Sequence, residues 1–327
     1  MSTAEAAPAP SPKAAILAEI ESLGLEKYRQ TLDEQGFVLI PPEIADPNKL
    51  APRMLDRILE VLEERSGVKP DLETGASHAG FKGNMVDPDS DEDSPWGESV
   101  RSLIHEGRVF EEALMNPVVL AMTTYLCGYS QVLSSYSSLV KGPNKSIFQF
   151  HSDTLLPPPW PDHAVVCNAT YVLTPFDREH GSTAFVPGSH KWGRGPLGNE
   201  SDVLTNPDAV PIEAEPGSIF VWHGNTWHGA FPRKAPGLRV STPILFARPW
   251  MRTEEDLFDS ITPEALKRNP ARFAHLTHQD IAFGWKSHAD YLKRSPKAYG
   301  NLEKFATEMG GLPRLNPMAY DDDLIFG

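Results

Sequence analysis

The stretch Ser146-Ile-Phe-Gln-Phe-His-Ser-Asp153 reads as an extended strand in which Gln149, His151 and Asp153 occupy alternate positions. Alternate residues of a strand share one face, so His151 and Asp153 point the same way with one residue between them. An imidazole and a carboxylate presented together suit a single metal ion. We therefore predict a strand over residues 147–153 that ends in a metal-binding pair.

Two other His-x-Asp pairs compete with this one, His278-Gln-Asp280 and His288-Ala-Asp290. The apolar residues around them recur at spacings of three and four, which favours helix. In a helix, residues two apart do not face each other. We therefore interpret these two pairs as surface or packing residues.

The second imidazole has two candidates, His223 and His228, in a single segment that runs from Gly217 to Arg233. Two imidazoles and one carboxylate on one side of a metal, with the other positions open, form the ligand set of non-haem Fe(II) oxygenases. The spacing of these residues does not by itself choose between the two histidines.

From Gln149 to Trp250 the chain resembles the phytanoyl-CoA dioxygenase-like family of Fe(II)/2-oxoglutarate oxygenases. In that family the distal histidine precedes the 2-oxoglutarate-binding arginine by eleven residues, which His228 and Arg239 satisfy, whereas His223 has Lys234 at that offset. The resemblance therefore implies His151, Asp153 and His228 as the catalytic metal ligands. It is carried by Gln149-Phe-His-Ser-Asp153, Glu179-His-Gly-Ser-Thr-Ala-Phe-Val-Pro-Gly-Ser-His190, Trp227-His228 and Arg239-Val-Ser241.

The resemblance also implies 2-oxoglutarate and O₂ as cosubstrates of the bound Fe(II). The planar guanidinium of Arg239 suits the far carboxylate of 2-oxoglutarate, and Ser241 falls on the same strand face. Gln149 and Thr183 are implied as further contacts. Two departures stand out: His180-Gly181 replaces the usual Asn-Gly, and Ala230 replaces a small hydroxyl residue that can contact the cosubstrate.

The activity implied by the family is hydroxylation of a substrate C–H bond, coupled to conversion of 2-oxoglutarate and O₂ to succinate and CO₂. Retention of Asp153 favours hydroxylation over halogenation, because halogenating relatives carry a small residue there. Two alternatives remain. A zinc-dependent hydrolase could use the same ligands, although Arg239 would then lack a role, and a non-enzymatic jelly-roll binding protein would need no metal.

Substrate contacts are expected from the loops 74–98 and 154–162, which carry Phe81, Trp96 and Trp160. These aromatic residues predict an apolar small molecule, such as a natural product. The sequence shows no basic cluster for the phosphates of an acyl-CoA. The loop 74–98 is either a mobile lid over the iron or plain disorder.

Composition narrows the remaining possibilities. The chain has 327 residues, of which 40% are hydrophobic, and a formal net charge of −14, which argues against nucleic acid and anionic membranes as partners. Two cysteines are too few for a disulfide framework. The sequence has no long apolar run and no basic leader followed by an apolar segment, so we expect a soluble, cytoplasmic protein. The oligomeric state is left open.

Several short strands separated by turn signals predict a mainly β protein with flanking helices and a double-stranded β-helix core, that is, a cupin-like jelly roll. We expect a disordered tail over 1–12 and one oxygenase domain over 13–327. That domain comprises a helical part (13–130), the jelly roll (about 131–250) and a second helical part (251–327) with an irregular end from 310. Helices are predicted at 13–35, 48–65, 99–107 and 110–126, and strands at 36–40, 132–140, 147–153, 164–173, 183–186, 218–222 and 239–247.

Overall fold

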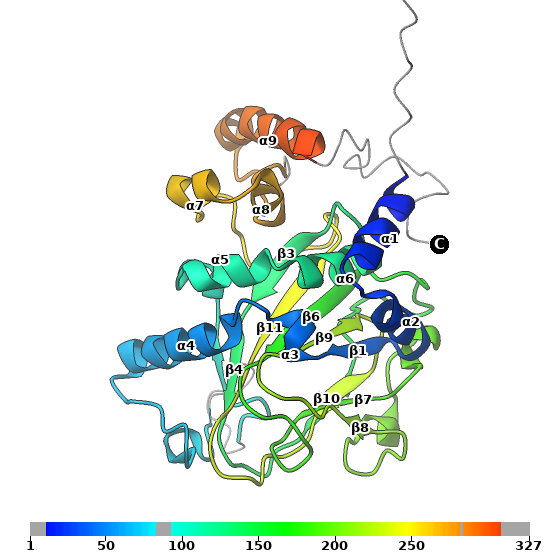
Figure 1. Cartoon of the computed structure of the whole chain (residues 1–327), viewed down its shortest axis with the longest axis vertical. Helices are drawn as coiled ribbons and strands as arrows, with labels where there is room; N and C mark the ends of the chain where they lie inside the picture. Colours follow the sequence, from blue (N-terminus) through cyan, green and yellow to red (C-terminus); the bar gives the residue numbers. More distant parts are fainter. Residues whose placement is uncertain (1–10, 83–92, 282–283, 309–327) are drawn as a thin grey trace, which may run out of the picture.

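The computed structural model describes residues 11–82, 93–281 and 284–308, and it places two antiparallel sheets against each other (Figure 1). The larger sheet has the strand order β1-β9-β6-β11-β4-β2, with β3 also paired to β11, and the smaller has the order β5-β10-β7-β8. This arrangement confirms the predicted mainly β jelly roll with flanking helices. The strands are β1 Phe37–Ile40, β2 Glu98–Val100, β3 Val132–Tyr136, β4 Ser138–Lys141, β5 Phe148–His151, β6 Val166–Val172, β7 Thr183–Phe185, β8 Val210–Pro211, β9 Ile219–His223, β10 His228–Ala230 and β11 Arg239–Ala247.

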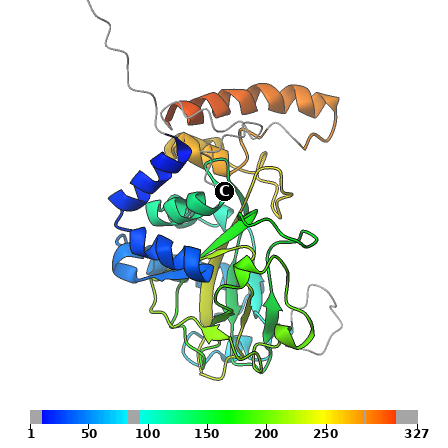
Figure 2. The same cartoon turned by 90° about the vertical axis from the view of Figure 1, so that its right-hand side faces the viewer.

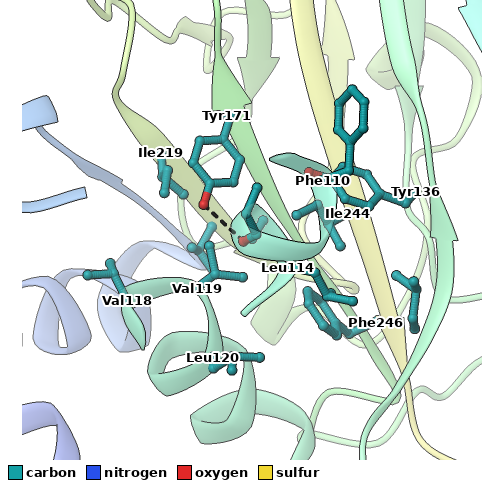
Figure 3. Packing of buried hydrophobic residues seen from close by; sticks show 14 of the residues in the cluster. Phe110, Leu114, Val118, Val119, Leu120, Tyr136, Tyr171, Ile219, Ile244 and Phe246 are labelled. Atoms are coloured by element: carbon teal, nitrogen blue, oxygen red, sulfur yellow. Dashed lines mark hydrogen bonds between the residues drawn. The ribbon is translucent and has the colours of Figure 1, made fainter. Parts of the chain in front are cut away.

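One face of the larger sheet is covered by helices α5 (Arg108–Leu114) and α6 (Pro117–Cys127). Figure 3 shows Phe110 and Leu114 of α5 packed close to Tyr136 and Ile244 of the sheet. The hydroxyl of the buried Tyr171 donates to the carbonyl oxygen of Ala113 at 3.0 Å, so the α5 backbone is also fixed by a hydrogen bond. The period-two alternation of the strands sends their remaining side chains to the other face, toward the smaller sheet.

The N-terminal helices run across the same side of the molecule. They are α1 (Pro12–Ser22), α2 (Glu26–Gln35), α3 (Pro42–Ala45) and α4 (Leu50–Ser66). The predicted single helix over 13–35 is interrupted at Gly24, which adopts a positive φ of 66° that L-residues rarely take. The predicted tail over 1–12 is too long, since Pro12 already begins α1, while residues 1–10 lie outside the described ones.

The predicted helix over 99–107 is wrong. That segment forms β2 and a short 3₁₀ helix, η2 (Leu103–His105), because Glu98 to Val100 pair with β4. Gly97 permits this close approach, since a Cβ there would stand 2.1 Å from the carbonyl oxygen of Val140. The predicted helix over 110–126 is divided into α5 and α6, and the side chain of Asn116 caps α6 by accepting from the Val118 amide.

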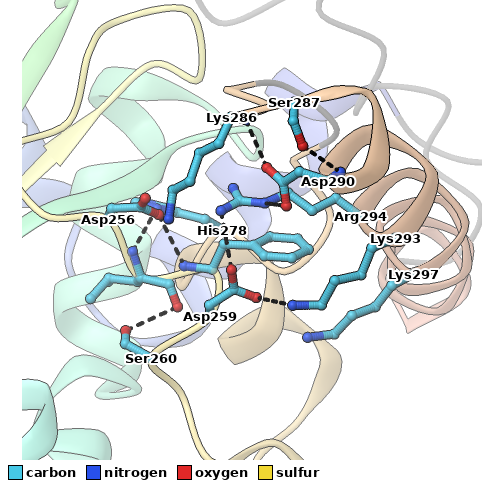
Figure 4. Close-up of polar contacts among 12 residues, drawn as sticks. Asp256, Asp259, Ser260, His278, Lys286, Ser287, Asp290, Lys293, Arg294 and Lys297 are labelled. Atoms are coloured by element: carbon cyan, nitrogen blue, oxygen red, sulfur yellow. Dashed lines mark hydrogen bonds and ion pairs between the residues drawn. The ribbon is translucent and has the colours of Figure 1, made fainter.

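The C-terminal helices α7 (Pro263–Arg268), α8 (Ala271–Leu276) and α9 (His288–Glu308) lie at one end of the molecule, and Figure 2 shows α9 extending across that end. Asp259 holds α9 through ion pairs with Lys293 and Arg294, both at 3.2 Å (Figure 4). One cluster of buried hydrophobic residues runs from Ile16 to Phe305. The predicted irregular end from 310 lies outside the described residues.

The described residues also form three further short 3₁₀ helices: η1 Ala76–His78, η3 Ser189–Lys191 and η4 Gly198–Ser201.

None of the helices among residues 11–82, 93–281 and 284–308 combines the length and the apolar character needed to cross a membrane.

Candidate metal centre and cosubstrate cavity

Two strands of the smaller sheet present a pair of histidines to each other. His151 of β5 lies directly opposite His228 of β10 in the antiparallel ladder, and the two ring centroids are 4.2 Å apart. Asp153 follows β5, where its backbone N–H donates to the carbonyl oxygen of Gly224 at 3.0 Å. One ligand atom from each of the three side chains lies within 4.8 Å of the others, so the group can hold one metal ion. The structure thus brings together the three residues that the sequence singled out.

Backbone carbonyls orient both imidazoles. The Nδ1 atom of His151 lies 3.0 Å from the carbonyl oxygen of Gln149, and that of His228 lies 3.0 Å from the carbonyl oxygen of Thr226. Because a carbonyl oxygen can only accept, Nδ1 carries the proton in each ring and the Nε2 lone pair is left for a metal. Burial lowers the pKa of His151 to about 4, with a further contribution from His228, so the ring is in the neutral form that binds metals.

Two donors on the larger sheet fix the Asp153 carboxylate. The amide nitrogen Nδ2 of Asn168 and the indole nitrogen Nε1 of Trp222 both donate to Oδ2, at 2.7 Å and 3.1 Å. The other oxygen, Oδ1, lies 3.6 Å from Nε2 of His228, on the side of the metal position. Sequence reasoning missed Asn168 and Trp222. Alternation along β6 and β9 places both side chains on the face toward the smaller sheet, but it does not show that Asp153 lies opposite them.

The competing histidine His223 lies on the other face of β9 from its neighbour Trp222. Its ring is packed toward the helices, with its centroid 5.6 Å from that of His190, and its Nδ1 accepts a hydrogen bond from the backbone N–H of Asn225. Burial, with a smaller contribution from His190, lowers the pKa of His223 to about 3. His223 is therefore a neutral packing histidine, separated from His151 by the sheet.

In the other two His-x-Asp pairs, the histidine and the carboxylate have different partners. His278 contacts the carbonyl oxygen of Leu133 through Nε2, at 2.7 Å. Asp280 pairs with His275, and Asp290 pairs with Arg294 within α9. Their interpretation as packing or surface residues agrees with these contacts.

A cavity of about 190 Å³ lies between the two sheets, and the metal-binding group forms part of its wall. Of the residues expected around the cosubstrate and substrate, Thr183, Arg239, Ser241 and Trp96 line it. The other lining residues are Arg101, Ser135, Ser137, Leu139, Phe148, Asn168, Thr170, Phe220, Trp222, Gly229, Ala230, Pro243, Leu245 and Glu254.

Arg239 is a buried cation at one end of this cavity, with 2% of its surface exposed. Its Nη1 donates to the carbonyl oxygen of Gly181, and its Nε has no hydrogen-bond partner. Within the described parts of the chain no carboxylate pairs with it. Burial, with a smaller contribution from Arg233, lowers the pKa of Arg239 to about 10, so the guanidinium is still charged at neutral pH. A buried charge without a counter-ion is costly, which makes this end of the cavity a receptor for an added carboxylate.

Gln149 does not share the face of His151, contrary to the prediction. The pairing of β5 with β10 shifts register, because three residue steps from Phe148 to His151 oppose two steps on β10. This bulge leaves the Gln149 side chain exposed and places Phe148 in the cavity wall, with its ring centroid 4.4 Å from that of His151.

Two of the three expected substrate contacts lie away from the cavity. Trp160 is buried, and its indole donates to the carbonyl oxygen of Leu156, while Phe81 stacks on His78. Trp96 alone of the three lines the cavity. Residues 83–92 of the expected lid lie outside the described residues.

Comparisons with known proteins agree with this geometry. The family model for phytanoyl-CoA dioxygenase (PhyH) matches residues 32–241, well over half of the chain. Dioxygenase af480 of Aspergillus fumigatus is 36% identical over 123 residues, which are 36% of this chain and 38% of that relative. Dioxygenase swnH1 of Arthroderma benhamiae is 36% identical over 85 residues, 26% of each chain. The chain thus matches well under half the length of these two curated relatives.

Among solved structures, HygX from Streptomyces hygroscopicus, with nickel and 2-oxoglutarate bound, superposes with a TM-score of 0.53 at 18% identity, covering 73% of this chain and 93% of HygX. EvdMO1 gives a TM-score of 0.50 at 22% identity, covering 69% of this chain and 50% of EvdMO1. At such identities the likeness concerns the fold. The fold and the family match together confirm the resemblance read from the sequence: the chain belongs to the phytanoyl-CoA dioxygenase family.

Proposed function

We propose that this protein is an Fe(II)- and 2-oxoglutarate-dependent dioxygenase that hydroxylates a C–H bond of an apolar small molecule. The observation that carries the proposal is the buried guanidinium of Arg239, which has no carboxylate partner among the described residues and lies in the same cavity as His151, Asp153 and His228. A metal-binding group alone would fit many reactions. A metal-binding group with a carboxylate receptor beside it fits a reaction that consumes a 2-oxo dicarboxylate.

The residues present fit Fe(II). Two imidazoles and one carboxylate supply the facial ligand set, and one ligand atom from each lies within 4.8 Å of the others. When bound, Fe(II) supplies O₂ activation, with conversion of 2-oxoglutarate and O₂ to succinate and CO₂ during substrate oxidation. Asn168 and Trp222 keep one carboxylate oxygen of Asp153 occupied, so the other is presented to the metal.

The remaining cavity residues bind and enclose the cosubstrate. Arg239 binds the far carboxylate through its guanidinium, and the hydroxyls of Ser241 and Thr183 lie in the same wall. Phe220 and Trp222 add aromatic surface to the cavity wall, which helps to exclude water from the cosubstrate.

The substrate class follows from the outer part of the cavity, by which we mean Trp96, Arg101, Phe148, Leu245 and Glu254, lining residues that are partly or fully exposed. Trp96, Phe148 and Leu245 form apolar walls, and the rings of Trp96 and Phe148 meet edge to face with centroids 5.0 Å apart. Arg101 and Glu254, the charged residues of this outer part, form an ion pair at 3.0 Å. This pairing does not favour a substrate with several phosphates, so an apolar natural product ranks above an acyl-CoA.

The test is succinate formation from 2-oxoglutarate in the presence of Fe(II), ascorbate and a panel of apolar small molecules, with ¹⁸O₂ to trace the oxygen atom. Substrate-dependent succinate and one ¹⁸O atom in the organic product are expected. Turnover with Zn(II) and no need for 2-oxoglutarate would establish the hydrolase alternative instead. Failure to take up iron under anaerobic reconstitution would favour a binding protein.

A further inference from the structure

A buried lysine lies next to Arg239 in the larger sheet. Lys141, the last residue of β4, is fully buried and lies directly opposite Arg239 in the β4–β11 ladder. Residues directly opposite in an antiparallel pair have side chains on the same face of the sheet. Lys141 therefore shares the cavity face with Arg239, and within the described residues no carboxylate forms an ion pair with it.

The ammonium of Lys141 joins three segments that each carry a part of the site. Its Nζ donates to the carbonyl oxygens of Pro95 at 2.6 Å, Ser146 at 2.9 Å and Phe231 at 3.4 Å. Pro95 precedes Trp96, Ser146 precedes the strand with His151, and Phe231 follows the strand with His228. One nitrogen atom thus fixes the aromatic wall of the cavity relative to both histidine strands.

The three acceptors suit only the charged form of the side chain. An ammonium has three N–H donors, one for each carbonyl, whereas a neutral amine has two and a lone pair that would face an oxygen. The surroundings oppose the charge: burial first, and then Arg239 and Arg233, lower the pKa of Lys141 to about 6, although Asp93 acts in the opposite direction. Asp93 itself pairs with Lys82 at 3.2 Å. A carboxylate arriving at Arg239 would add the missing negative charge and favour the ammonium with its three hydrogen bonds.

We propose that Lys141 is a positioning residue that couples binding of a dicarboxylate at Arg239 to the placement of Trp96 over the outer cavity. The proposal rests on the function proposed above. It makes cosubstrate binding a step that completes the substrate pocket, because the loop that carries Trp96 is held by the same ammonium that senses the anion.

The test uses full-length protein loaded with Zn(II), a diamagnetic stand-in for Fe(II), in which the seven tryptophans are replaced by 5-fluorotryptophan. Trp96→Phe assigns the ¹⁹F resonance of Trp96. Addition of saturating 2-oxoglutarate should shift that resonance in the wild-type protein and in Lys145→Met, a control at an exposed position four residues away. In Lys141→Met the shift should be lost, although calorimetry still detects 2-oxoglutarate binding. If that variant does not fold, Lys141→Gln, which keeps two N–H donors without the charge, takes its place.

The outcomes separate this inference from the proposed function. An equal Trp96 shift in the Lys141 variant, or no shift in the wild-type protein despite calorimetric binding, overturns the coupling alone. Absence of any 2-oxoglutarate binding to the metal-loaded wild-type protein overturns the proposed function and the coupling with it.

Discussion

At the scale of single residues, the three metal-binding side chains are not interchangeable with the other histidines of the chain. His151→Ala, Asp153→Ala and His228→Ala should each abolish iron-dependent succinate formation, because each removes one of three donors that meet within 4.8 Å. The exposed His288 provides the control, and His288→Ala should retain activity. Iron content after anaerobic loading is measured beside activity. Full iron binding by His228→Ala would show that the ligand set has been wrongly assigned.

Arg239 permits a test of the cosubstrate. Arg239→Lys keeps a charge but loses the planar fork, and a charge-assisted hydrogen bond is worth about 1.5–3 kcal/mol. We expect the KM for 2-oxoglutarate to rise by about tenfold or more, with a smaller fall in kcat. The measurement is succinate formation over a range of 2-oxoglutarate concentrations. An unchanged KM would assign the carboxylate to another cation, with the buried Arg233 the first to examine.

Trp222 should affect metal affinity through its hydrogen bond to Asp153. Trp222→Phe removes the indole N–H that donates to Oδ2 while keeping an aromatic ring in the cavity wall. Loss of a group that orients a ligand lowers metal affinity about 10- to 100-fold in other metal sites. Titration with Co(II), followed by its absorption spectrum, measures the effect. Trp192→Phe, at a half-exposed position away from the cavity, is the matched control and should bind Co(II) as the wild-type protein does.

At the scale of secondary-structure elements, the bulge in β5 decides which residues reach the cosubstrate. Gln149→Ala should change the KM for 2-oxoglutarate by less than about twofold, because the exposed side chain makes no hydrogen bond among the described residues. Thr183→Ala, in the cavity wall, should raise it more. Steady-state kinetics on both variants provides the comparison. A larger effect at Gln149 than at Thr183 would mean that β5 pairs without the bulge when the cosubstrate is bound.

The elements also show which parts of the fold could be read from the sequence. Strands β6, β9 and β11 were predicted because long apolar or alternating runs reveal buried strands directly. Edge strand β2 was wrongly predicted as part of a helix. Its three residues are held in the sheet only by pairing with β4, a contact between segments some forty residues apart. The spacing of apolar residues within one segment does not predict such a pairing.

The candidate site shows the same limit. Strand alternation singled out His151 and Asp153, and the resemblance to the family, through its spacing of distal histidine and arginine, implied His228 rather than His223. The bulge at Gln149 was hidden, because it depends on how β5 meets β10. Asn168, Trp222 and Lys141 act through contacts between strands far apart in the sequence, and a single sequence does not show which strands meet.

At the scale of the whole molecule, one hydrophobic cluster extends from α1 to α9, and the larger sheet separates it from the cavity. The chemistry is therefore confined between the two sheets, while the helices support the larger sheet from behind. His223 and His190 belong to this supporting side, next to α2, and take no part in the metal group.

These two histidines predict acid sensitivity of the whole fold. Burial lowers the pKa of His223 to about 3 and that of His190 to about 4, from an ordinary value of 6.5. Between the lowered pKa and 6.5, each of these histidines is protonated in the unfolded chain but not in the folded chain. The free energy of unfolding therefore falls as the pH drops below 6.5. Each histidine contributes a loss of about 1.4 kcal/mol per pH unit in this range.

Thermal denaturation of the metal-free protein at pH 7 and pH 5 measures this loss as a fall in Tm. His223→Asn should reduce the fall, because an asparagine oxygen can still accept from the Asn225 amide but does not titrate. His151, whose pKa is also lowered by burial, keeps part of the slope in that variant, and His288→Ala, at an exposed position, should leave the slope unchanged. If His223→Asn loses as much Tm between pH 7 and pH 5 as the wild-type protein, His223 is protonated in the folded chain, and its buried, neutral packing beneath the larger sheet is refuted.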